Sequence, residues 1–489
     1  MNKDFNLKLI AKIQGSILLI EGVFLLSAYF VSLYFNENTG FSFIFPIIIC
    51  VIAGLTGLLI GKNSLPHLGK REGALIVTST WFLFSLIGMM PFLLSGSITG
   101  VANAFFETMS GFTTTGASIL NNIEELPRSI LFWRSMTHWI GGLGIIAISM
   151  ALLPMFGFAG MQIFSAEVTG PTKDKIHPKI SETAKRLLLI YIALTLMETI
   201  LLKFAGMSWF DALTHSFGTI ATGGFSTKQA SIGHYNSPLM EYIIIFFMIF
   251  SGVNFALYYF LIKLKIEKVI RNEELKIFLF IIVSFAILLT LVQIDFEKSF
   301  NLQNFADYFR NGLFVTTSTI STTGFTTVDY NLWPTVSWYL ILILMLIGSS
   351  AGSTAGGIKV VRVLLVFKYI YLEFKRFVHP NAVLPVRYNS HVLSENIVAR
   401  LLAFTLLYFV LIFMGSTLLS ISGLGFVESF SGMITCISDV GPGLGTIGPA
   451  YNFSHLNDLS KWFLAFVMLL GRLEIFTVLL IFTPVFWKK

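Results

Sequence analysis

The chain has 489 residues, of which 55% are hydrophobic and only 12% are charged, and its mean hydropathy is +0.78. These values place it among integral membrane proteins rather than soluble globular ones. The formal net charge of +7 does not indicate a nucleic-acid partner, because most Lys and Arg residues gather in alternate connections between apolar stretches. The positive-inside rule predicts that distribution for cytoplasmic loops, and it puts both termini in the cytoplasm.

Ten apolar stretches follow one another along the chain, and most are close to the ~20 residues that a helix needs to cross a bilayer. They lie near 13–35, 41–61, 75–96, 130–156, 187–206, 238–262, 277–294, 335–374, 397–420 and 461–486. The first is too long for a signal peptide and has no A-x-A cleavage pattern, so we expect it in the mature protein. The two cysteines, Cys50 and Cys436, lack any metal-ligand pattern, so we expect no metal site and no cofactor in this chain.

Four further segments lie between these spans, each on the predicted outer side. They are about a dozen residues long, which is enough to enter a bilayer as helix but not to cross it. They cover 101–112, 209–220, 308–320 and 425–437. Each leads into a glycine-bearing stretch, and aligning these stretches puts Gly116, Gly223, Gly324 and Gly441 in one register. Repetition at about a hundred residues predicts four units of span, re-entrant segment and span.

The residues before these glycines form two further predicted layers. One layer contains Thr115, Thr222, Thr323 and Val440, and the layer before it contains Thr114, Ala221, Thr322 and Asp439. Backbone without helical hydrogen bonds is tolerated inside a membrane only where it lines water, ions or protein. Four such stretches around one axis predict a ring of carbonyls, which can replace the hydration shell of a potassium ion. The ordinary occurrence of glycine in loops and turns would explain one such stretch but not four in register.

A run of small residues interrupts the third unit's second span. The 13 apolar residues 335–347 precede "GSSAGSTAGG", residues 348–357. A helix of that length rises ~20 Å of the ~30 Å hydrocarbon core, so the run begins part-way through the membrane. It could form a flexible gating loop beneath the filter, with Gly348, Gly352, Gly356 and Gly357 as hinges. Alternatively, Gly348, Gly352 and Gly356 could form a G-x-x-x-G helix-packing face.

Arg472 lies near the middle of the last predicted span, where a charge should face a watery cavity or a partner. A pore-facing arginine would hinder cation passage by Coulomb repulsion. The alternative is a structural ion pair, for which Glu198 is a candidate partner. An intramembrane enzyme would need a converging nucleophile and base. His138, His215 and Asp211 are the candidates, but the two histidines fall in different units, so we expect structural roles for them. A receptor or scaffold would leave the glycine stretches unexplained.

These motifs resemble the membrane subunit of Trk-type potassium transporters, in the superfamily that also includes Ktr and plant HKT proteins. "TTTGAS", "ATGGFST", "TTGFTT" and "VGPGLG" are similar to the family's four filter stretches. "GSSAGSTAGGIK" and "GRLEIFT" are similar to its gate and pore-arginine segments. The resemblance covers about residue 75 to the C-terminus, and the two spans before it resemble the Trk branch.

The resemblance implies potassium uptake across a prokaryotic cytoplasmic membrane, gated by 348–357 and Arg472. It also implies a homodimer docked on a cytosolic nucleotide-binding regulatory subunit of the Trk A type. The chain itself has no credible nucleotide-binding motif and is expected to be neither an enzyme nor a nucleic-acid-binding protein. A sodium-selective carrier, or one coupled to sodium or protons, is the alternative within transport.

The expected fold is an all-α polytopic membrane protein, with two N-terminal transmembrane helices and four pseudo-repeated helix/pore-loop/helix units around one pore. The expected parts are an N-terminal hairpin at 1–70, unit one at 71–165, unit two at 180–265, unit three at 272–378 with its intramembrane loop at 348–357, and unit four at 395–489. Membrane lipid would surround them.

Overall fold

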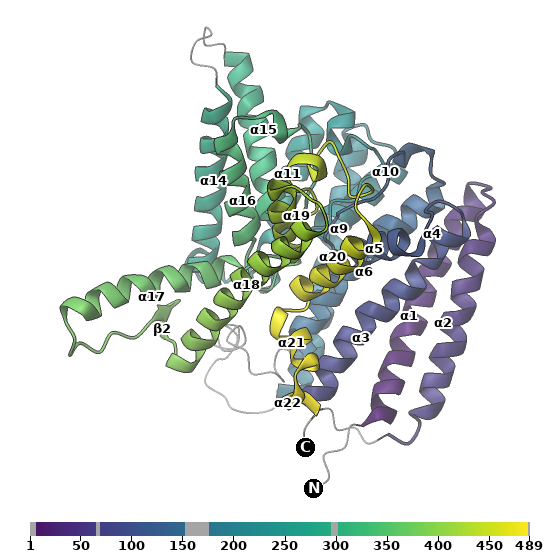
Figure 1. Cartoon of the computed structure of the whole chain (residues 1–489), viewed down its shortest axis with the longest axis horizontal. Helices are drawn as coiled ribbons and strands as arrows, with labels where there is room; N and C mark the ends of the chain where they lie inside the picture. Colours follow the sequence, from purple (N-terminus) through teal and green to yellow (C-terminus); the bar gives the residue numbers. More distant parts are fainter. Residues whose placement is uncertain (1–5, 65–68, 152–175, 295–301, 488–489) are drawn as a thin grey trace.

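The computed structural model describes residues 6–64, 69–151, 176–294 and 302–487. Its regular secondary structure is almost entirely helical, and most of the long helices stand side by side (Figure 1). Six of the described helices are long and apolar enough to cross a membrane, or up to eight spans if each bent helix pair is one span. The predicted all-α polytopic fold is therefore confirmed.

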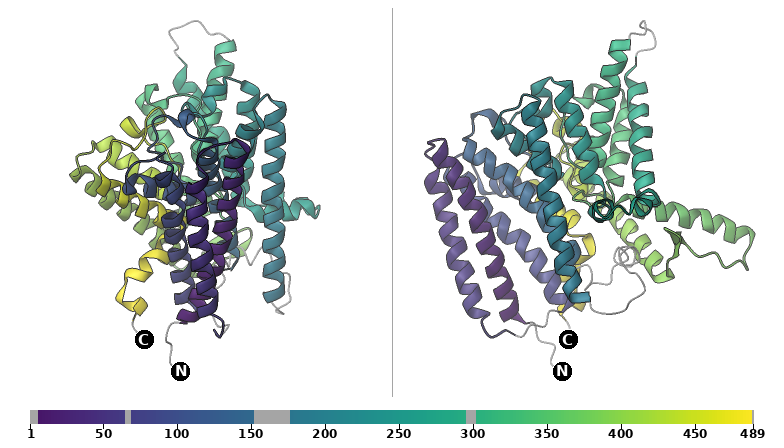
Figure 2. Two further views of the ribbon diagram at one scale, coloured as in Figure 1. Left: turned by 90° about the vertical axis from the view of Figure 1, so that its right-hand side faces the viewer. Right: turned by 180° about the vertical axis from the view of Figure 1, so that it is seen from behind.

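The first two helices form a hairpin at one side of the molecule, as the right-hand view of Figure 2 shows. These helices are α1 (Leu7–Tyr34) and α2 (Gly40–Ile60). Glycines let their backbones meet, because a Cβ on Gly57 would lie 2.6 Å from the carbonyl oxygen of Ala11. A Cβ on Gly15 would lie equally close, 2.6 Å, to the carbonyl oxygen of Gly54. Small residues at helix contacts are the usual means of close packing in membranes.

We expect Gly57→Leu to lower the thermal stability of the purified protein, because the new side chain would be forced into the backbone of α1. Overpacking of this kind costs roughly 1–3 kcal/mol. The measurement is the melting temperature in detergent. Thr56→Leu is the matched control, because the adjacent Thr56 is exposed on the same helix. Equal melting temperatures of the two variants would contradict a tight glycine contact.

Each of the four units begins with a span and continues with a re-entrant helix. The first spans are α3 (Lys70–Gly88) with its continuation α4 (Met90–Leu94), α9 (Ile176–Phe204), α14 (Glu273–Gln293) and α18 (Glu395–Ile421). The re-entrant helices are α5 (Val101–Phe112), α10 (Trp209–Ile220), α15 (Leu302–Ile320) and α19 (Phe426–Ser438). The ends of α5 and α10 are as predicted, α19 is displaced by one residue from 425–437, and α15 begins before the predicted 308.

The second spans of the units are α6 (Arg128–Ala151), α11 (Pro238–Gly252), α16 (Thr335–Ile347) and α20 (Asp458–Arg472). Helices α6, α16 and α20 enclose the main hydrophobic core together with α5 and α19, and Phe106, Phe112 and Trp133 are fully buried in it. Helix α11 packs in separate, smaller clusters. A short 3-10 turn precedes each of the four second spans on the way back from the re-entrant segment. The turns are Ile123–Glu125, Ser231–Tyr235, Tyr330–Leu332 and Gly445–Ile447.

Two stretches predicted as single spans are bent instead. Within 238–262 the chain turns by 96° between α11 and α12 (Phe255–Ile262), and within 461–486 it turns by 116° after α20. At the first bend, the Asn254 side chain accepts a hydrogen bond from Ala256 N at 2.9 Å and so caps a new helix. At the second bend, Glu474 has a positive φ of 62°, which ends helix α20. Short helices follow the bends: α13 (Ile266–Ile270), α21 (Ile475–Leu479), a 3-10 turn (Leu480–Phe482) and α22 (Pro484–Trp487).

Helix α17 (Val360–Val378) points away from the bundle, at a steep angle to α14 and α16 (Figure 1). A two-stranded antiparallel ribbon follows it, with β1 (Arg387–Tyr388) paired to β2 (His391–Val392). These two short strands are the only ones in the described ranges, and they leave the fold class unchanged.

Candidate functional site

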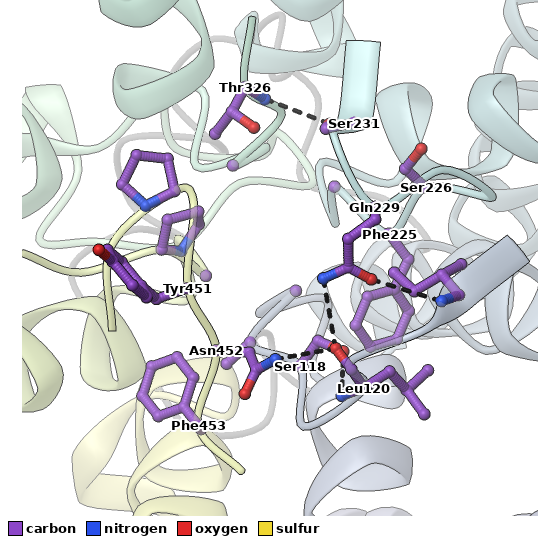
Figure 3. Close-up of a pocket in the computed structure, with 18 of the residues that line it drawn as sticks. Ser118, Leu120, Phe225, Ser226, Gln229, Ser231, Thr326, Tyr451, Asn452 and Phe453 are labelled. Atoms are coloured by element: carbon purple, nitrogen blue, oxygen red, sulfur yellow. Dashed lines mark hydrogen bonds between the residues drawn. The ribbon is translucent and has the colours of Figure 1, made fainter. Parts of the chain in front are cut away.

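The extended segments that follow the four re-entrant helices meet at one cavity. We call them return segments, and they cover 113–118, 221–226, 321–326 and 439–444. The cavity is lined by one glycine from each segment: Gly116, Gly224, Gly324 and Gly441. Figure 3 shows labelled wall residues from all four units, among them Ser118, Gln229, Thr326 and Asn452. Four segments that are far apart in the sequence thus form a single site.

The return segments follow one another around a closed ring. A Cβ on Gly116 would overlap the carbonyl oxygen of Gly223, which belongs to the next segment. The same relation holds for Gly224 with the carbonyl oxygen of Thr323, and for Gly324 with that of Val440. The ring closes at Gly441, whose Cβ would lie 2.8 Å from the carbonyl oxygen of Thr115. All four glycines also have a positive φ. Each position therefore needs glycine for two reasons: its backbone conformation, and the carbonyl of the next segment that a Cβ would meet.

The backbone corrects the predicted register of the second unit. The structural equivalents of Gly116 are the positive-φ glycines Gly224, Gly324 and Gly441. The alignment of Gly223 with Gly116 is therefore wrong by one residue. Two adjacent glycines in "ATGG" offer the sequence two equally good alignments, and only the backbone conformation distinguishes them.

The two preceding layers shift in the same way. One contains Thr115, Gly223, Thr323 and Val440, whose N–H groups each donate to the carbonyl five residues earlier, at 2.8–3.0 Å. The layer before it contains Thr114, Thr222, Thr322 and Asp439, all with φ between 53° and 57°. Ala221 lies one residue outside these layers, in the right-handed helical conformation that ends α10.

Polar side chains of these layers make few contacts with one another. Thr115 donates to Asp439 Oδ1 at 2.9 Å. The other carboxylate oxygen of Asp439 and the hydroxyl of Thr114 are buried and have no hydrogen-bond partner among the described residues. Unsatisfied buried polar groups are costly in a membrane, so these two side chains need a partner that the described residues do not supply.

The small-residue loop, residues 348–357, lies against the inner ends of three re-entrant helices. Ser349 Oγ donates to Ile320 O, the last carbonyl of α15, at 2.8 Å. Thr354 Oγ1 donates to Ile220 O of α10 at 3.0 Å. A Cβ on Gly356 would overlap the carbonyl oxygen of Ser438, the last residue of α19. Gly356 N also donates to the Thr322 hydroxyl at 2.8 Å, so the loop touches the return segments directly.

The loop is not a helix-packing face. Gly348, Gly352 and Gly357 have φ values of 67°, 77° and 77°, which no right-handed helix contains. The predicted end of the helix at residue 347 is confirmed. The G-x-x-x-G interpretation of this run is therefore wrong.

Arg472 joins this loop to the first unit. Its guanidinium donates to the carbonyl of Thr354 at 2.6 Å and to that of Gly141 at 2.9 Å. The side chain is buried, and in the described part of the chain no carboxylate lies within ion-pair distance of it. The predicted alternative of a pair with Glu198 is thus not observed, and Arg472 lies at the end of α20 rather than in mid-helix.

The bend in unit two holds the other side of the loop, which the sequence analysis did not foresee. Ser350 N donates to Gly252 O at 3.1 Å, and Phe255 N donates to Gly352 O at 3.1 Å. The buried Glu274 of α14 accepts a hydrogen bond from Ala351 N at 2.7 Å. The run Ser251, Gly252 and Asn254 within an apolar stretch was the local sign of this bend.

The histidines have structural contacts, as expected. His215 bonds to Asp211 O at 2.7 Å and to Ser226 Oγ at 2.9 Å, which ties α10 to its own return segment. His138 Nε2 accepts from Phe225 N at 3.3 Å. Across the described ranges, no group of three or more His, Cys, Asp or Glu residues could hold a metal ion.

Comparison with known proteins gives a consistent result. Residues 40–489 match the family model TrkH, described as a cation transport protein. The chain is 38% identical over 483 residues to the Trk system potassium uptake protein TrkH of Salmonella typhimurium and to that of Escherichia coli, covering 98% of this chain and 99% of each relative. The crystal structure of the potassium transporter TrkH from Vibrio parahaemolyticus matches with a TM-score of 0.90 and 34% identity, over 99% of this chain and all of that one.

Proposed function

Because the chain belongs to the TrkH family of cation transport proteins, we propose that it takes up potassium across the cytoplasmic membrane of a prokaryotic cell. It is a multi-pass membrane protein of a bacterial transporter family and not an enzyme. The observation that carries the proposal is the closed ring of four return segments, in which each glycine abuts a carbonyl of the next segment. The relatives' names, which specify potassium uptake, support the choice of ion.

Selectivity in this proposal comes from backbone carbonyls, with threonine hydroxyls at the inner end of the ring. Carbonyl oxygens held at fixed spacing replace the hydration shell of potassium, and glycine leaves the bore free of side chains. The proposed filter uses the corrected register: Thr114, Thr115, Gly116, Thr222, Gly223, Gly224, Thr322, Thr323, Gly324, Asp439, Val440 and Gly441. Ala221 is no longer included.

Permeation in this proposal is controlled below the filter by the small-residue loop and Arg472. The contacts of the loop with Ile220, Ile320 and Ser438 support this role, because they put it across the inner ends of three re-entrant helices. Gly348, Gly352, Gly356 and Gly357 would give the loop the freedom to move aside. Arg472 donates to Thr354 O of the loop, so a movement of the loop would also change the position of this positive charge beneath the filter.

The proposed assembly is a homodimer docked on a cytosolic nucleotide-binding subunit of the Trk A type, with both termini cytoplasmic. We retain the proposed division into a hairpin at 1–70 and units at 71–165, 180–265, 272–378 and 395–489; residues 152–175 and 295–301 lie outside the described part.

The proposal is tested by tracer rubidium uptake into proteoliposomes, with potassium, sodium and lithium as competitors. We expect potassium to compete and sodium not to compete. In Gly116→Ser the new side chain would overlap Gly223 O, so sodium should compete in this variant. The expected relaxation is at least roughly tenfold in the potassium-to-sodium ratio, equivalent to ~1.4 kcal/mol.

Gly96→Ser is the control, because Gly96 also has a positive φ, 71°, but has no neighbouring atom within 4 Å of an added Cβ. It should leave ion preference unchanged. Equal competition by sodium and potassium in the wild-type protein would overturn the potassium proposal and favour a sodium-conducting or sodium-coupled carrier.

A further inference from the structure

The second return segment lacks a side chain that the other three possess. Thr115, Thr323 and Val440 occupy the middle layer in units one, three and four, whereas unit two has Gly223. Gly223 does not have a positive φ, unlike the glycines of the layer above it. Its backbone conformation therefore does not require glycine, and the absence of a side chain needs another reason.

His138 of α6 occupies the space where that side chain would lie. A Cβ on Gly223 would overlap Nδ1 of the imidazole, and the nearest three atoms to such a Cβ all belong to His138. The ring is completely buried, and its centroid lies 4.0 Å from that of Phe225. Nε2 accepts the hydrogen bond from Phe225 N, at 3.3 Å, so an unprotonated Nε2 holds the backbone of this return segment.

Arg134, one turn earlier on α6, holds the same return segment. Its guanidinium donates to Ser226 O at 2.9 Å and lies over the Phe225 ring, with Cζ 3.6 Å from the centroid. The remaining nitrogens donate to Glu107 of α5 at 2.7 Å and to the Ser118 hydroxyl at 3.1 Å. One face of α6 therefore connects the first and second return segments.

Resting on the potassium filter proposed above, we propose that His138 is a positioning residue of that filter. Its imidazole stands in unit two where the other units have a threonine or valine side chain, and it fixes the Phe225 backbone. A histidine from the neighbouring unit needs more room than a threonine hydroxyl, which is why only glycine fits at 223. Ion preference should then depend on the His138 side chain of α6, which packs against the second return segment.

The test is a pair of substitutions, Gly223→Thr and His138→Ala, made singly and together. Each single variant should lose potassium preference, Gly223→Thr because Thr overlaps the imidazole and His138→Ala because the segment loses its support. The double variant recreates the threonine of units one and three in the vacated space. Its potassium-to-sodium preference should be at least about tenfold higher than that of Gly223→Thr alone.

Ion preference is read as the rise in melting temperature of the purified protein in potassium compared with sodium, and as sodium competition in rubidium uptake. The melting temperature reports ion binding even when no ions pass through the protein. Gly223→Thr combined with His215→Ala is the matched control, because His215 bonds to Ser226 Oγ of the same segment but is not among the atoms nearest a Cβ on Gly223. It should show no recovery.

His138→Gln and His138→Leu provide a second comparison that avoids the double variant. Gln can keep an acceptor near the position of Nε2, so it should retain more potassium preference than Leu at equal folded yield. No recovery in the double variant, or equal preference of the Gln and Leu variants, would overturn the role of His138 while leaving the potassium filter intact. A wild-type protein without potassium preference would overturn the filter proposal itself.

Discussion

Removal of residues 351–354 from the small-residue loop is expected to raise rubidium uptake into proteoliposomes by at least roughly tenfold, a change that needs only ~1.4 kcal/mol off the barrier. The deletion removes Thr354, whose hydroxyl bonds to the last carbonyl of α10 and whose carbonyl accepts from Arg472. It also shortens the chain that crosses beneath α15 and α19. The shortened loop, which we propose as the gate, would then no longer reach across the inner ends of the re-entrant helices.

The control is deletion of 381–383, an exposed connection between α17 and β1 that lies away from the return segments. It should leave uptake unchanged. Rubidium competition by potassium and sodium should remain as in the wild type for both deletions, because the glycine-to-carbonyl ring is untouched. A folded loop deletion with wild-type or lower uptake would contradict the gating role and leave the loop as a structural support for the return segments.

Arg472→Ala is the second change from which we expect faster uptake, again by roughly tenfold. Arg472 is a buried cation beneath the proposed filter, and a like charge in a poorly screened site opposes the entry of a potassium ion. The substitution also releases the loop, because the bonds to Thr354 O and Gly141 O are both lost. The measurement is the initial rate of rubidium uptake at equal amounts of reconstituted protein.

Arg472→Lys separates the two causes. Lysine keeps the positive charge but cannot reproduce the two bonds of the guanidinium to Thr354 O and Gly141 O. Slow uptake in the lysine variant, with fast uptake in the alanine variant, would identify the charge as the barrier. Fast uptake in both would identify the tether to the loop.

Arg310→Ala is the control for loss of a partly buried arginine. Arg310 of α15 pairs with Glu241 of α11 at 2.8 Å and with Asp307 of its own helix at 2.8 Å. This variant should not accelerate uptake. A folded Arg472→Ala protein that is no faster than the wild type would show that the arginine serves only to hold α6 and the loop together.

Features that depend on length and local composition could be predicted from the sequence. Four re-entrant segments could be found because a dozen residues cannot span a bilayer as helix. The end of α16 at Ile347 was predictable because a run of glycine and serine follows 13 apolar residues. Gly116, Gly324 and Gly441 could be aligned from the sequence because no second glycine is adjacent to any of them.

Features that depend on neighbours distant in sequence could be assigned only once the packing between units was known. Gly223 and Gly224 are adjacent and chemically identical, and their different roles come from His138 beside one and the Thr323 carbonyl beside the other. The bend at Asn254 exists beside the loop of unit three, where Phe255 N finds Gly352 O. Arg472 likewise has partners on two other units rather than on its own helix. A backbone group freed inside a membrane must find a partner, and the identity of that partner is set by packing between units rather than by the local sequence.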